Sequence, residues 1–247
     1  MRLAVVSDLH GNLDALEAVV ADLAEAAPDL VINLGDCLSG PLDAAACCDR
    51  LIDLGWPTVR GNHDRQLLDR PIERMGLSDA ATRARLAPHH LAWLAALPTT
   101  LAPAPGILAF HGAPDDDLAY VAEEVSETGT RLRSPTEIAT ILGATEATLL
   151  IGGHTHVPRL IDCGDGRRYL NPGSIGLPAY EDDHPVFHVM ETGSPDARYA
   201  VIDLDRPRPR VAFRHVAYDP TRAVAAALAA ARDDWAEALA TGFRRGR

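Results

Sequence analysis

Short apolar runs alternate with amphipathic stretches in the first half of the chain. The apolar runs cover residues 3–7, 30–34, 106–110 and 148–151, and their lengths are typical of buried strands. Between the first two runs, apolar residues recur at helical spacing and predict an amphipathic helix that ends before Pro28, with Leu13, Leu16, Val20 and Leu23 on its apolar face. Residues 43–54 are also predicted to be helical, and residues 58–60 to form a brief strand. Such alternation favours an α/β fold.

Two segments interrupt this alternation. Residues 65–97 have a helical pattern broken by Pro71 and Pro88, and we interpret them as a helical cap inserted near the active site. Residues 112–133 are rich in Asp and Glu before any basic residue follows, and they are predicted to form an acidic loop. Ser134 begins a capping box with Glu137, which predicts a helix that ends near Gly143.

The second half has a different pattern. Short β-like runs, separated by Gly, Pro and Asp, lie at 159–163, 167–170, 187–190, 199–204 and 211–217. Apolar residues at helical spacing then predict one C-terminal helix over residues 219–243. Strands that alternate with helices first and cluster later favour two stacked mixed sheets with helices outside. We expect residues 1–247 to form a single domain.

The net charge of −12 argues against non-specific binding to nucleic acid, which depends on Lys and Arg. It does not exclude a phosphate substrate, because bound divalent metals reverse the local field. No apolar run reaches the ~18 residues that a membrane span needs, and the first residues form a core strand rather than a signal peptide. Four cysteines without a CxxC pair are expected to be buried and reduced, so a cytoplasmic protein is predicted.

Polar motifs follow the predicted strands at five places. They are Asp8-Leu9-His10, Gly35-Asp36, Gly61-Asn62-His63-Asp64, His111-Gly112 and Gly153-His154-Thr155-His156. Because open α/β sheets assemble their sites at the carboxyl ends of strands, we expect these side chains to meet. The alternation in Asp8-Leu9-His10 predicts an extended segment with both donors on one side.

Carboxylate, imidazole and amide donors in this number suit a pair of divalent ions. Two-metal hydrolases hold their ions ~3.5–4 Å apart, and a shared carboxylate is the simplest bridge. Asp36 is the natural bridging residue. Mn is the metal we expect first, and Fe, Ni, Co, Zn or Mg are compatible with the same donors.

The order and spacing of these motifs resemble the calcineurin-like metallophosphoesterase superfamily, over roughly residues 1–175. The similarity is greatest to its small prokaryotic phosphodiesterases and diadenosine-tetraphosphatase-like proteins. The resemblance implies a four-layer α/β/β/α sandwich with Asp36 as the bridge. It also implies one metal site made with Asp8, His10 and His156 and a second made with Asn62, His111 and His154.

His63 lies beside a predicted ligand and directly before Asp64. An imidazole oriented by a carboxylate is the arrangement of a general acid, and the resemblance implies the same role. The hypothesis is that a metal-bridging hydroxide attacks phosphorus in line, while His63, oriented by Asp64, protonates the leaving group. The remaining histidines, His89, His90, His184, His188 and His215, are expected to be structural or at the surface.

The reaction class has alternatives. A phosphodiesterase acting on a small phosphate ester, which could be a nucleotide, is the main hypothesis. A protein or small-molecule phosphomonoesterase is the first alternative. Protein Ser/Thr phosphatases, however, place an Arg soon after the second motif, and here Asp36 is followed by residues 37–41 without one. A catalytically quiet scaffold of the same fold is the other alternative, and the oligomeric state is left open.

Overall fold

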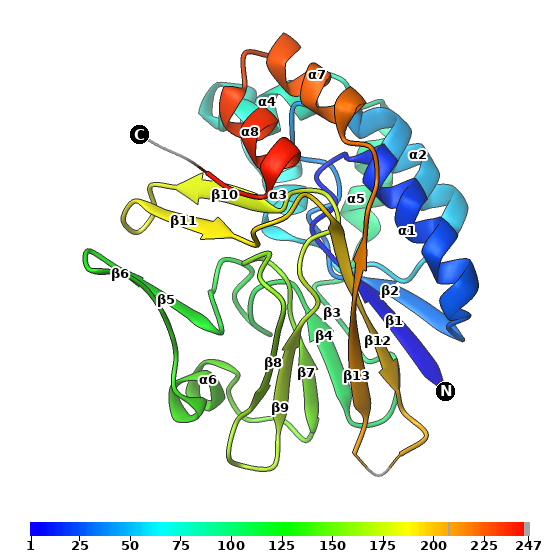
Figure 1. The fold of residues 1–247 in the computed structure, drawn as a ribbon, viewed down its shortest axis with the longest axis vertical. Helices are drawn as coiled ribbons and strands as arrows, with labels where there is room; N and C mark the ends of the chain where they lie inside the picture. The colour runs from blue at the N-terminus through cyan, green and yellow to red at the C-terminus, as the bar shows by residue number, and fades with distance from the viewer. Residues whose placement is uncertain (207, 245–247) are drawn as a thin grey trace.

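Two mixed β-sheets stack face to face in the centre of the molecule (Figure 1). The computed structural model describes residues 1–206 and 208–244. The first sheet has the order β13 (Arg210–Val216), β12 (Ala197–Asp203), β1 (Arg2–Val6), β2 (Leu30–Asn33), and only β1 and β2 are parallel. The second has the order β3 (Thr100–Leu101), β4 (Ile107–Phe110), β7 (Leu149–Ile151), β9 (Arg168–Asn171), β8 (Arg159–Asp162). Its three central strands, β4, β7 and β9, are parallel.

The alternation of side chains along β1 explains how the sheets are covered. Leu3 and Val5 belong to the cluster between the two sheets, together with Ile107, Ile151 and Leu170 of the second sheet. Ala4 and Val6 point to the opposite face, into a separate cluster with the helices. Because successive residues of a strand face opposite sides, the four residues from Leu3 to Val6 are all buried, alternately in one cluster and the other.

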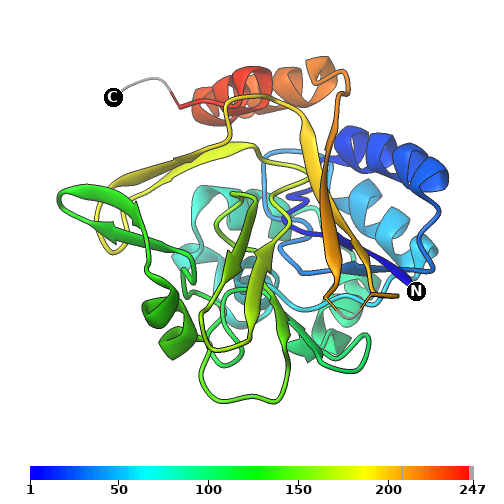
Figure 2. The same ribbon diagram turned by 60° about the horizontal axis from the view of Figure 1, so that its bottom comes forward.

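Helices form the two outer layers (Figures 1 and 2). The first sheet is covered by α1 (Leu13–Ala26) and α2 (Ala44–Leu54), whose boundaries lie close to the predicted ones. The second sheet packs Phe110, Leu150 and Tyr169 against α6 (Pro135–Ile141), where Ser134 and Glu137 form the predicted capping box. The layers therefore follow the α/β/β/α order, and the predicted fold class is confirmed.

Residues 65–97 are largely helical, as predicted. They contain most of α3 (Asn62–Asp69), a short 3₁₀ helix (Ile72–Arg74), α4 (Leu77–Arg83) and α5 (Pro88–Ala96). Pro88 is the first residue of α5, the helical position that proline tolerates best.

The prediction that residues 112–133 form a loop throughout is wrong. The segment ends in a hairpin of β5 (Glu123–Ser126) and β6 (Gly129–Leu132). Its register places Glu124 opposite Arg131, and these side chains form an ion pair. Cross-strand pairing of opposite charges makes an acidic stretch compatible with a strand. A second hairpin, β10 (Ala179–Asp182) and β11 (His188–Glu191), includes a strand that the sequence pattern did not indicate.

The single helix predicted over residues 219–243 is in fact two, α7 (Thr221–Ala229) and α8 (Asp233–Thr241). The chain breaks at Ala231, whose φ of 55° lies in the left-handed region. Asp233 and Asp234 occupy the first turn of α8, where the helix dipole favours negative charge. The break lets Trp235 and Leu239 of α8 enter the core while Leu228 of α7 stays exposed.

All four cysteines are buried and unpaired, as expected. Within residues 1–206 and 208–244, no helix is long and apolar enough to cross a membrane. Residues 245–247 lie outside the described part of the chain. They belong to the predicted domain and follow the predicted C-terminal helix.

Candidate metal centre

The strand ends of both sheets bring the predicted donors together as two adjacent groups. The first group is Asp8, His10 and His156, and the second is Asp36, His111 and His154. Within each group the three ligand atoms lie within 4.8 Å of one another. This is the division that the resemblance implied for the two metal sites. His111 Nε2 lies 4.0 Å from Asp8 Oδ1 and 3.2 Å from Asp36 Oδ2, so the two groups adjoin.

Asn62 completes the second group. One end of its side-chain amide lies 3.0–3.2 Å from three atoms, His111 Nε2, His154 Nδ1 and Asp36 Oδ2. With the oxygen at this end, it faces the lone pairs of His154 Nδ1 and Asp36 Oδ2. A cation between them would turn this unfavourable contact into coordination.

The backbone at the site is strained in a systematic way. Five of the seven donors have φ in the left-handed region: Asp8 (55°), His10 (51°), Asp36 (52°), His154 (69°) and His156 (61°). The prediction that Asp8 and His10 alternate along an extended segment is therefore wrong, since β1 ends at Val6 and the two donors lie on a tight turn. Left-handed conformations of residues other than glycine are unfavourable and concentrate at functional sites.

Glycine at position 35 permits the close approach of two motifs. Its φ of 95° favours glycine, and a Cβ there would lie 2.4 Å from the backbone nitrogen of Gly61. Gly61 in turn leaves room for the Asp36 carboxylate, whose Oδ1 would lie 2.2 Å from a Cβ at that position. The motifs that carry Asp36 and Asn62 can therefore meet only as glycine-containing loops.

Three of the histidines present the same ring nitrogen to the site. The Nδ1 atoms of His10, His111 and His156 donate to the backbone oxygens of Ser39, Leu34 and Leu177 at 2.7–2.8 Å. In the neutral ring, donation from Nδ1 leaves a lone pair on Nε2, the usual arrangement for metal-ligating histidines. The Nε2 atoms of His10 and His156 lie only 3.1 Å apart, so two such lone pairs face each other.

A buried carboxylate oxygen completes the argument for a cation. Asp8 is fully buried, and no donor among the described residues hydrogen-bonds to its Oδ1. His156 Nε2, which could form an ion pair with this oxygen only if the ring were protonated, lies 3.5 Å from Asp8 Oδ1. Buried charges without partners are costly, and a divalent ion among these donors would remove that cost. The residues therefore fit a pair of divalent ions.

Burial and charge separate the pKa values of the histidines. Burial, together with His156 for one ring and His111 for the other, lowers the pKa of His10 to about 4 and that of His154 to about 3. Burial opposes protonation of His111 as well, but the Asp36 carboxylate outweighs it and raises the pKa of His111 to about 10. His10 and His154 are thus neutral at pH 7, which is the form that binds metal.

The orientation of His63 differs from the prediction. The Asp64 carboxylate accepts backbone N–H groups of Asp36 (2.8 Å), Cys37 (3.0 Å) and Gly61 (3.0 Å), so it organises the loops and does not orient the His63 ring. His63 Nδ1 instead pairs with Asp79 Oδ1 of α4 at 2.8 Å. Burial works against the imidazolium, but Asp36 and Asp79 raise the pKa of His63 to about 9. Burial and Asp36 raise the pKa of Asp64 to about 6.

Asp79 is the site residue that sequence reasoning missed. It is 2% exposed and also accepts a hydrogen bond from Ser39 Oγ at 2.6 Å. The same Ser39 provides the backbone oxygen that orients His10. Asp79 lies within the helical segment 65–97, and no motif marks it in the sequence.

A cavity of about 460 Å³ lies beside His63. Its walls come from α3, α4, β10 and the turn between α7 and α8, with His63 and Asp79 among the lining residues. The His63 side chain is 34% exposed, so a ligand in this cavity could reach the ring.

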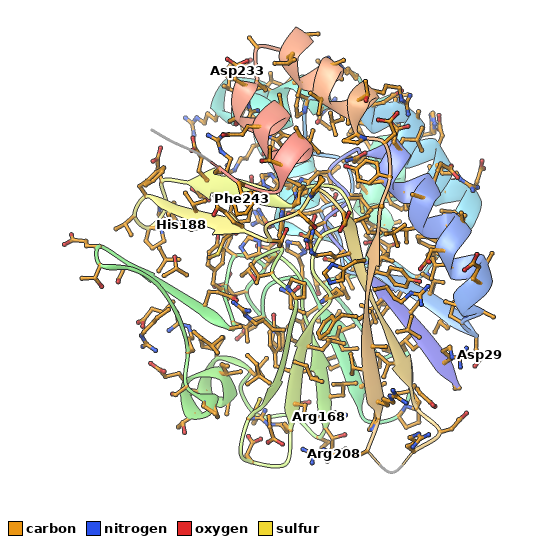
Figure 3. All side chains as sticks on the ribbon, in the orientation of Figure 1. Asp29, Arg168, His188, Arg208, Asp233 and Phe243 are labelled. Carbon is orange, nitrogen blue, oxygen red and sulfur yellow. The ribbon has the colours of Figure 1, made fainter. Side chains whose placement is uncertain are left out.

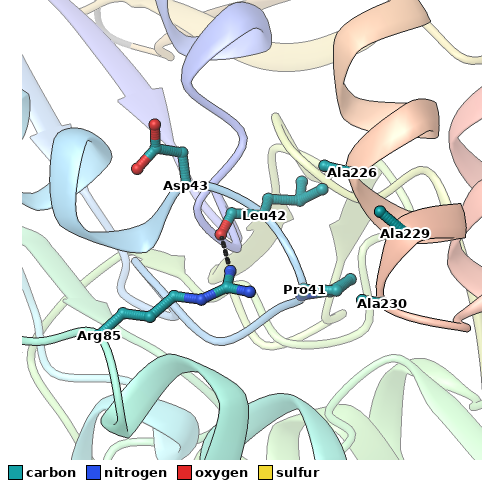
Figure 4. Close-up of a pocket in the computed structure, with 7 residues that line it drawn as sticks. All are labelled: Pro41, Leu42, Asp43, Arg85, Ala226, Ala229 and Ala230. Atoms are coloured by element: carbon teal, nitrogen blue, oxygen red, sulfur yellow. Dashed lines mark hydrogen bonds between the residues drawn. The ribbon is translucent and has the colours of Figure 1, made fainter.

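A second cavity, of about 450 Å³, lies between α7 and the loop before α2 (Figure 4). Most of its lining is apolar, and Arg85 spans it to donate to the backbone oxygen of Leu42 at 2.9 Å. Neither cavity is lined by a donor residue, but the first is lined by His63 and Asp79, which makes it the candidate substrate pocket.

Asp49, His89 and His90 form a third cluster of potential donors. His90 Nδ1, however, accepts the backbone N–H of Ala87 at 3.1 Å, so the proton of the neutral ring is on Nε2, which donates to Asp49 at 2.9 Å. A metal at Nε2 would force two donors against each other at Ala87. This cluster ties α5 to α2, in agreement with the structural role expected for these histidines.

Two tyrosines cover His154 and His156, the last of the candidate donors. Tyr120 packs edge to face on His154, with ring centroids 4.9 Å apart, and Tyr180 packs on His156 at 4.7 Å. The two hydroxyls lie 2.7 Å apart, and Tyr120 also contacts Nε2 of His188, which is labelled in Figure 3. The segment before β5 and the β10–β11 hairpin therefore meet over the candidate centre.

Comparison with known proteins yields one family and several similar structures. The sequence model of the calcineurin-like phosphoesterase superfamily domain matches residues 1–194. A crystal structure of a metallophosphoesterase from Sphaerobacter thermophilus is 26% identical, with a TM-score of 0.76 over 98% of this chain and 100% of that one. A candidate diadenosine tetraphosphatase is 16% identical, with a TM-score of 0.52 over 86% of this chain and 93% of that one, and this likeness shows the fold.

A curated relative matches over a shorter region. An uncharacterised protein of Methanocaldococcus jannaschii is 36% identical over 66 residues. The match spans 27% of this chain and 27% of that protein, about a quarter of the relative's length.

Proposed function

Because this chain belongs to the calcineurin-like phosphoesterase superfamily, we propose that it is a metal-dependent phosphoesterase that hydrolyses small phosphodiesters. The observation that carries the proposal is the pair of adjoining donor groups, in which imidazole lone pairs and a buried, unpartnered carboxylate oxygen converge beside His63. Asp8, His10 and His156 would hold one ion, and Asn62, His111 and His154 the other. Asp36 would bridge them.

Two divalent ions, when bound, would activate water and stabilise the charge that develops on the phosphoryl oxygens. Mn is our first candidate, and the donor set also suits Fe, Co, Ni, Zn or Mg. Since the metals supply these effects, the remaining task of the protein is to orient the ester and to protonate the leaving group.

His63 would protonate the leaving group. Water contributes a hydroxyl group to phosphorus, the bond from phosphorus to the leaving oxygen breaks, and His63 transfers a proton from Nε2 to that oxygen. The proton is regained from solvent before the next turnover. Asp79 would keep the ring in place through Nδ1, while Asp64 would hold the loops that carry Asp36 and Gly61.

The cavity beside His63 favours a diester over a monoester. Its volume of about 460 Å³ is in the range of small-molecule sites, so it could hold the alcohol half of a diester next to the acid. The absence of Arg from residues 37–41 also weighs against a protein phosphatase. A nucleotide is one possible substrate, and location in the cytoplasm stays a prediction from the sequence.

The test is hydrolysis of bis-p-nitrophenyl phosphate and p-nitrophenyl phosphate by metal-stripped protein, before and after addition of Mn. We expect activity that depends on Mn and prefers the diester. A preference for the monoester would replace the diesterase with a phosphomonoesterase. No hydrolysis of either ester by protein with two bound ions per chain would favour a scaffold.

A further inference from the structure

The turn between α7 and α8 and the first turn of α8 lie beyond residue 194, where the family match ends, and yet they contact the candidate site. From these contacts we propose that the turn between α7 and α8 positions the general acid: Arg232 holds α4 so that Asp79 meets His63. The inference rests on the proposed function for the role of His63 as the acid, but the geometry itself can be tested in metal-free protein.

Arg232 is fixed on three sides. Its guanidinium makes a two-point ion pair with Asp234, at 2.8 and 2.6 Å, and stacks over the ring of Trp235 at 5.6 Å. The remaining nitrogen, Nη1, donates to Ser78 Oγ at 2.8 Å. An arginine held in this way is a rigid support rather than a mobile surface charge, and its side chain is 17% exposed.

Ser78 directly precedes Asp79, so the bond from Arg232 acts next to the carboxylate that contacts His63. The helix that carries both residues, α4, has seven residues and depends on tertiary contacts for its position. Thr82 secures the later part of α4 by hydrogen bonds with Gly40. Arg232 secures its first turn.

Trp235 brings the same turn into contact with the metal centre. It is 7% exposed and packs edge to face on His10, with ring centroids 5.8 Å apart. Its ring also lies against the backbone of Gly40, where a Cβ would come within 2.7 Å. Gly40 follows Ser39, which bonds both His10 and Asp79. The α7–α8 turn therefore supports the segment that connects the metal ligand to the acid.

The critical experiment compares Arg232→Ala with Arg222→Ala. Arg222 is the matched control, because it belongs to the same helix pair and also makes a two-point ion pair, with Asp14 of α1, away from the cavity. Ser78→Ala removes the acceptor while leaving the charge of Arg232 in place. All variants are first checked for an unchanged circular dichroism spectrum.

The first measurement is the imidazole ¹H–¹⁵N spectrum of metal-free protein, with the His63 Nδ1–H signal assigned by its loss in His63→Asn. We expect a protected signal in the wild type and in Arg222→Ala, and a weakened or absent one in Arg232→Ala and Ser78→Ala. An unchanged signal in Arg232→Ala would overturn the proposal. This result does not depend on whether the protein hydrolyses phosphodiesters.

The second measurement is hydrolysis by the metal-loaded enzyme of two diesters that differ in leaving-group basicity, bis-p-nitrophenyl phosphate and diphenyl phosphate. A misplaced acid harms the more basic leaving group selectively, so Arg232→Ala should lose roughly tenfold more activity on the diphenyl ester. Equal losses on both esters would indicate a structural role and contradict the proposal. If the wild type hydrolyses neither ester, the proposed function fails, and the spectrum still decides the positioning role.

Discussion

At the scale of single residues, the proposed roles of His63 as the acid and of the donors as metal ligands can be tested separately. The His63 ring pairs with Asp79, whereas its backbone N–H donates to Asp36 Oδ1 at 2.9 Å. His63→Asn keeps the backbone contact and removes the acid. We expect two bound ions per chain as in the wild type and a turnover of diphenyl phosphate lowered by roughly a hundredfold. Elemental analysis and steady-state kinetics would check both, and loss of metal in this variant would refute the assignment.

Asp36 is expected to behave differently, because it belongs to one donor group and is the proposed bridge to the other. Asp36→Asn should weaken both metal sites together, since the amide cannot supply two anionic oxygens to two cations. Metal content after dialysis against Mn is the measurement. Asp49→Asn, in the cluster with His89 and His90, is the control and should retain both ions. Loss of a single ion in Asp36→Asn would show that Asp36 serves only one site.

The contrast between Asp64 and Asp79 shows what local sequence can and cannot predict. The seven candidate donors could be proposed because they lie in short motifs that follow recognisable strands. The partner of His63 could not, since α3 begins at Asn62 and consecutive helical residues point in different directions. Asp64 therefore turns toward the loops. The true partner comes from α4, sixteen residues along the chain, and only tertiary packing brings it close.

At the scale of secondary structure, the break between α7 and α8 gives a stability prediction. Ala231 is exposed and has a φ of 55°, a conformation that is unfavourable for alanine and available to glycine. Ala231→Gly should stabilise the protein by about 0.5–1 kcal/mol after allowance for the greater freedom of glycine in the unfolded chain. Ala225→Gly, in the interior of α7, should destabilise it by a similar amount. Thermal unfolding of both variants is the measurement, and a loss of stability in Ala231→Gly would contradict the predicted relief of backbone strain.

The attachment of α1 to the first sheet predicts a pH effect. Asp22 of α1 accepts hydrogen bonds from Tyr199 of β12 and Arg214 of β13, and chiefly the Arg214 contact lowers the pKa of Asp22. A carboxyl group with a lowered folded-state pKa stabilises the protein above its unfolded pKa, near 4, and loses that contribution as the pH falls through the folded value.

Asp22→Asn should therefore cost about 1–2 kcal/mol of unfolding free energy at pH 7, and progressively less below about pH 4. Denaturant unfolding at a series of pH values would measure this difference. The control variant is Asp53→Asn, at an exposed position of α2. We expect it to change the unfolding free energy little across the pH series. A cost for Asp22→Asn that persists at low pH would contradict the electrostatic explanation.

The hydrophobic pattern predicted helices and strands best where one face of the element is buried. The strands β1, β2, β4 and β7 and the amphipathic α1 follow from their apolar pattern, because their apolar side chains are buried in the core. The two-residue strand β3 was not indicated by the sequence. The β5–β6 hairpin and the α7–α8 break did not follow from the pattern either. In the hairpin, all four β6 residues are exposed, so no apolar alternation marks the strand. At the break, the Ala-rich sequence continues a helical pattern through a left-handed residue.

At the scale of the whole molecule, the candidate centre joins parts that are distant in sequence. Its donors follow strands of both sheets, from Asp8 to His156, and are supported by Leu177 and by Trp235 of α8. Several of the donors are buried acceptors that face one another, so the metal-free state keeps unfavourable contacts in the middle of the fold. Metal binding should for that reason stabilise the entire domain rather than a local loop.

A ligand that binds only the folded state stabilises it by about 2.7 kcal/mol at 100 times its Kd. For a chain of this size that corresponds to a rise in Tm of roughly 5–10 °C. We expect the Tm of metal-stripped protein to rise by this amount on titration with Mn, and chelation with EDTA to reverse it. Asp36→Asn should show a much smaller rise, whereas Asp49→Asn should match the wild type. A Tm that does not respond to any of the candidate metals would mean that the donor groups, despite their geometry, do not form a metal centre.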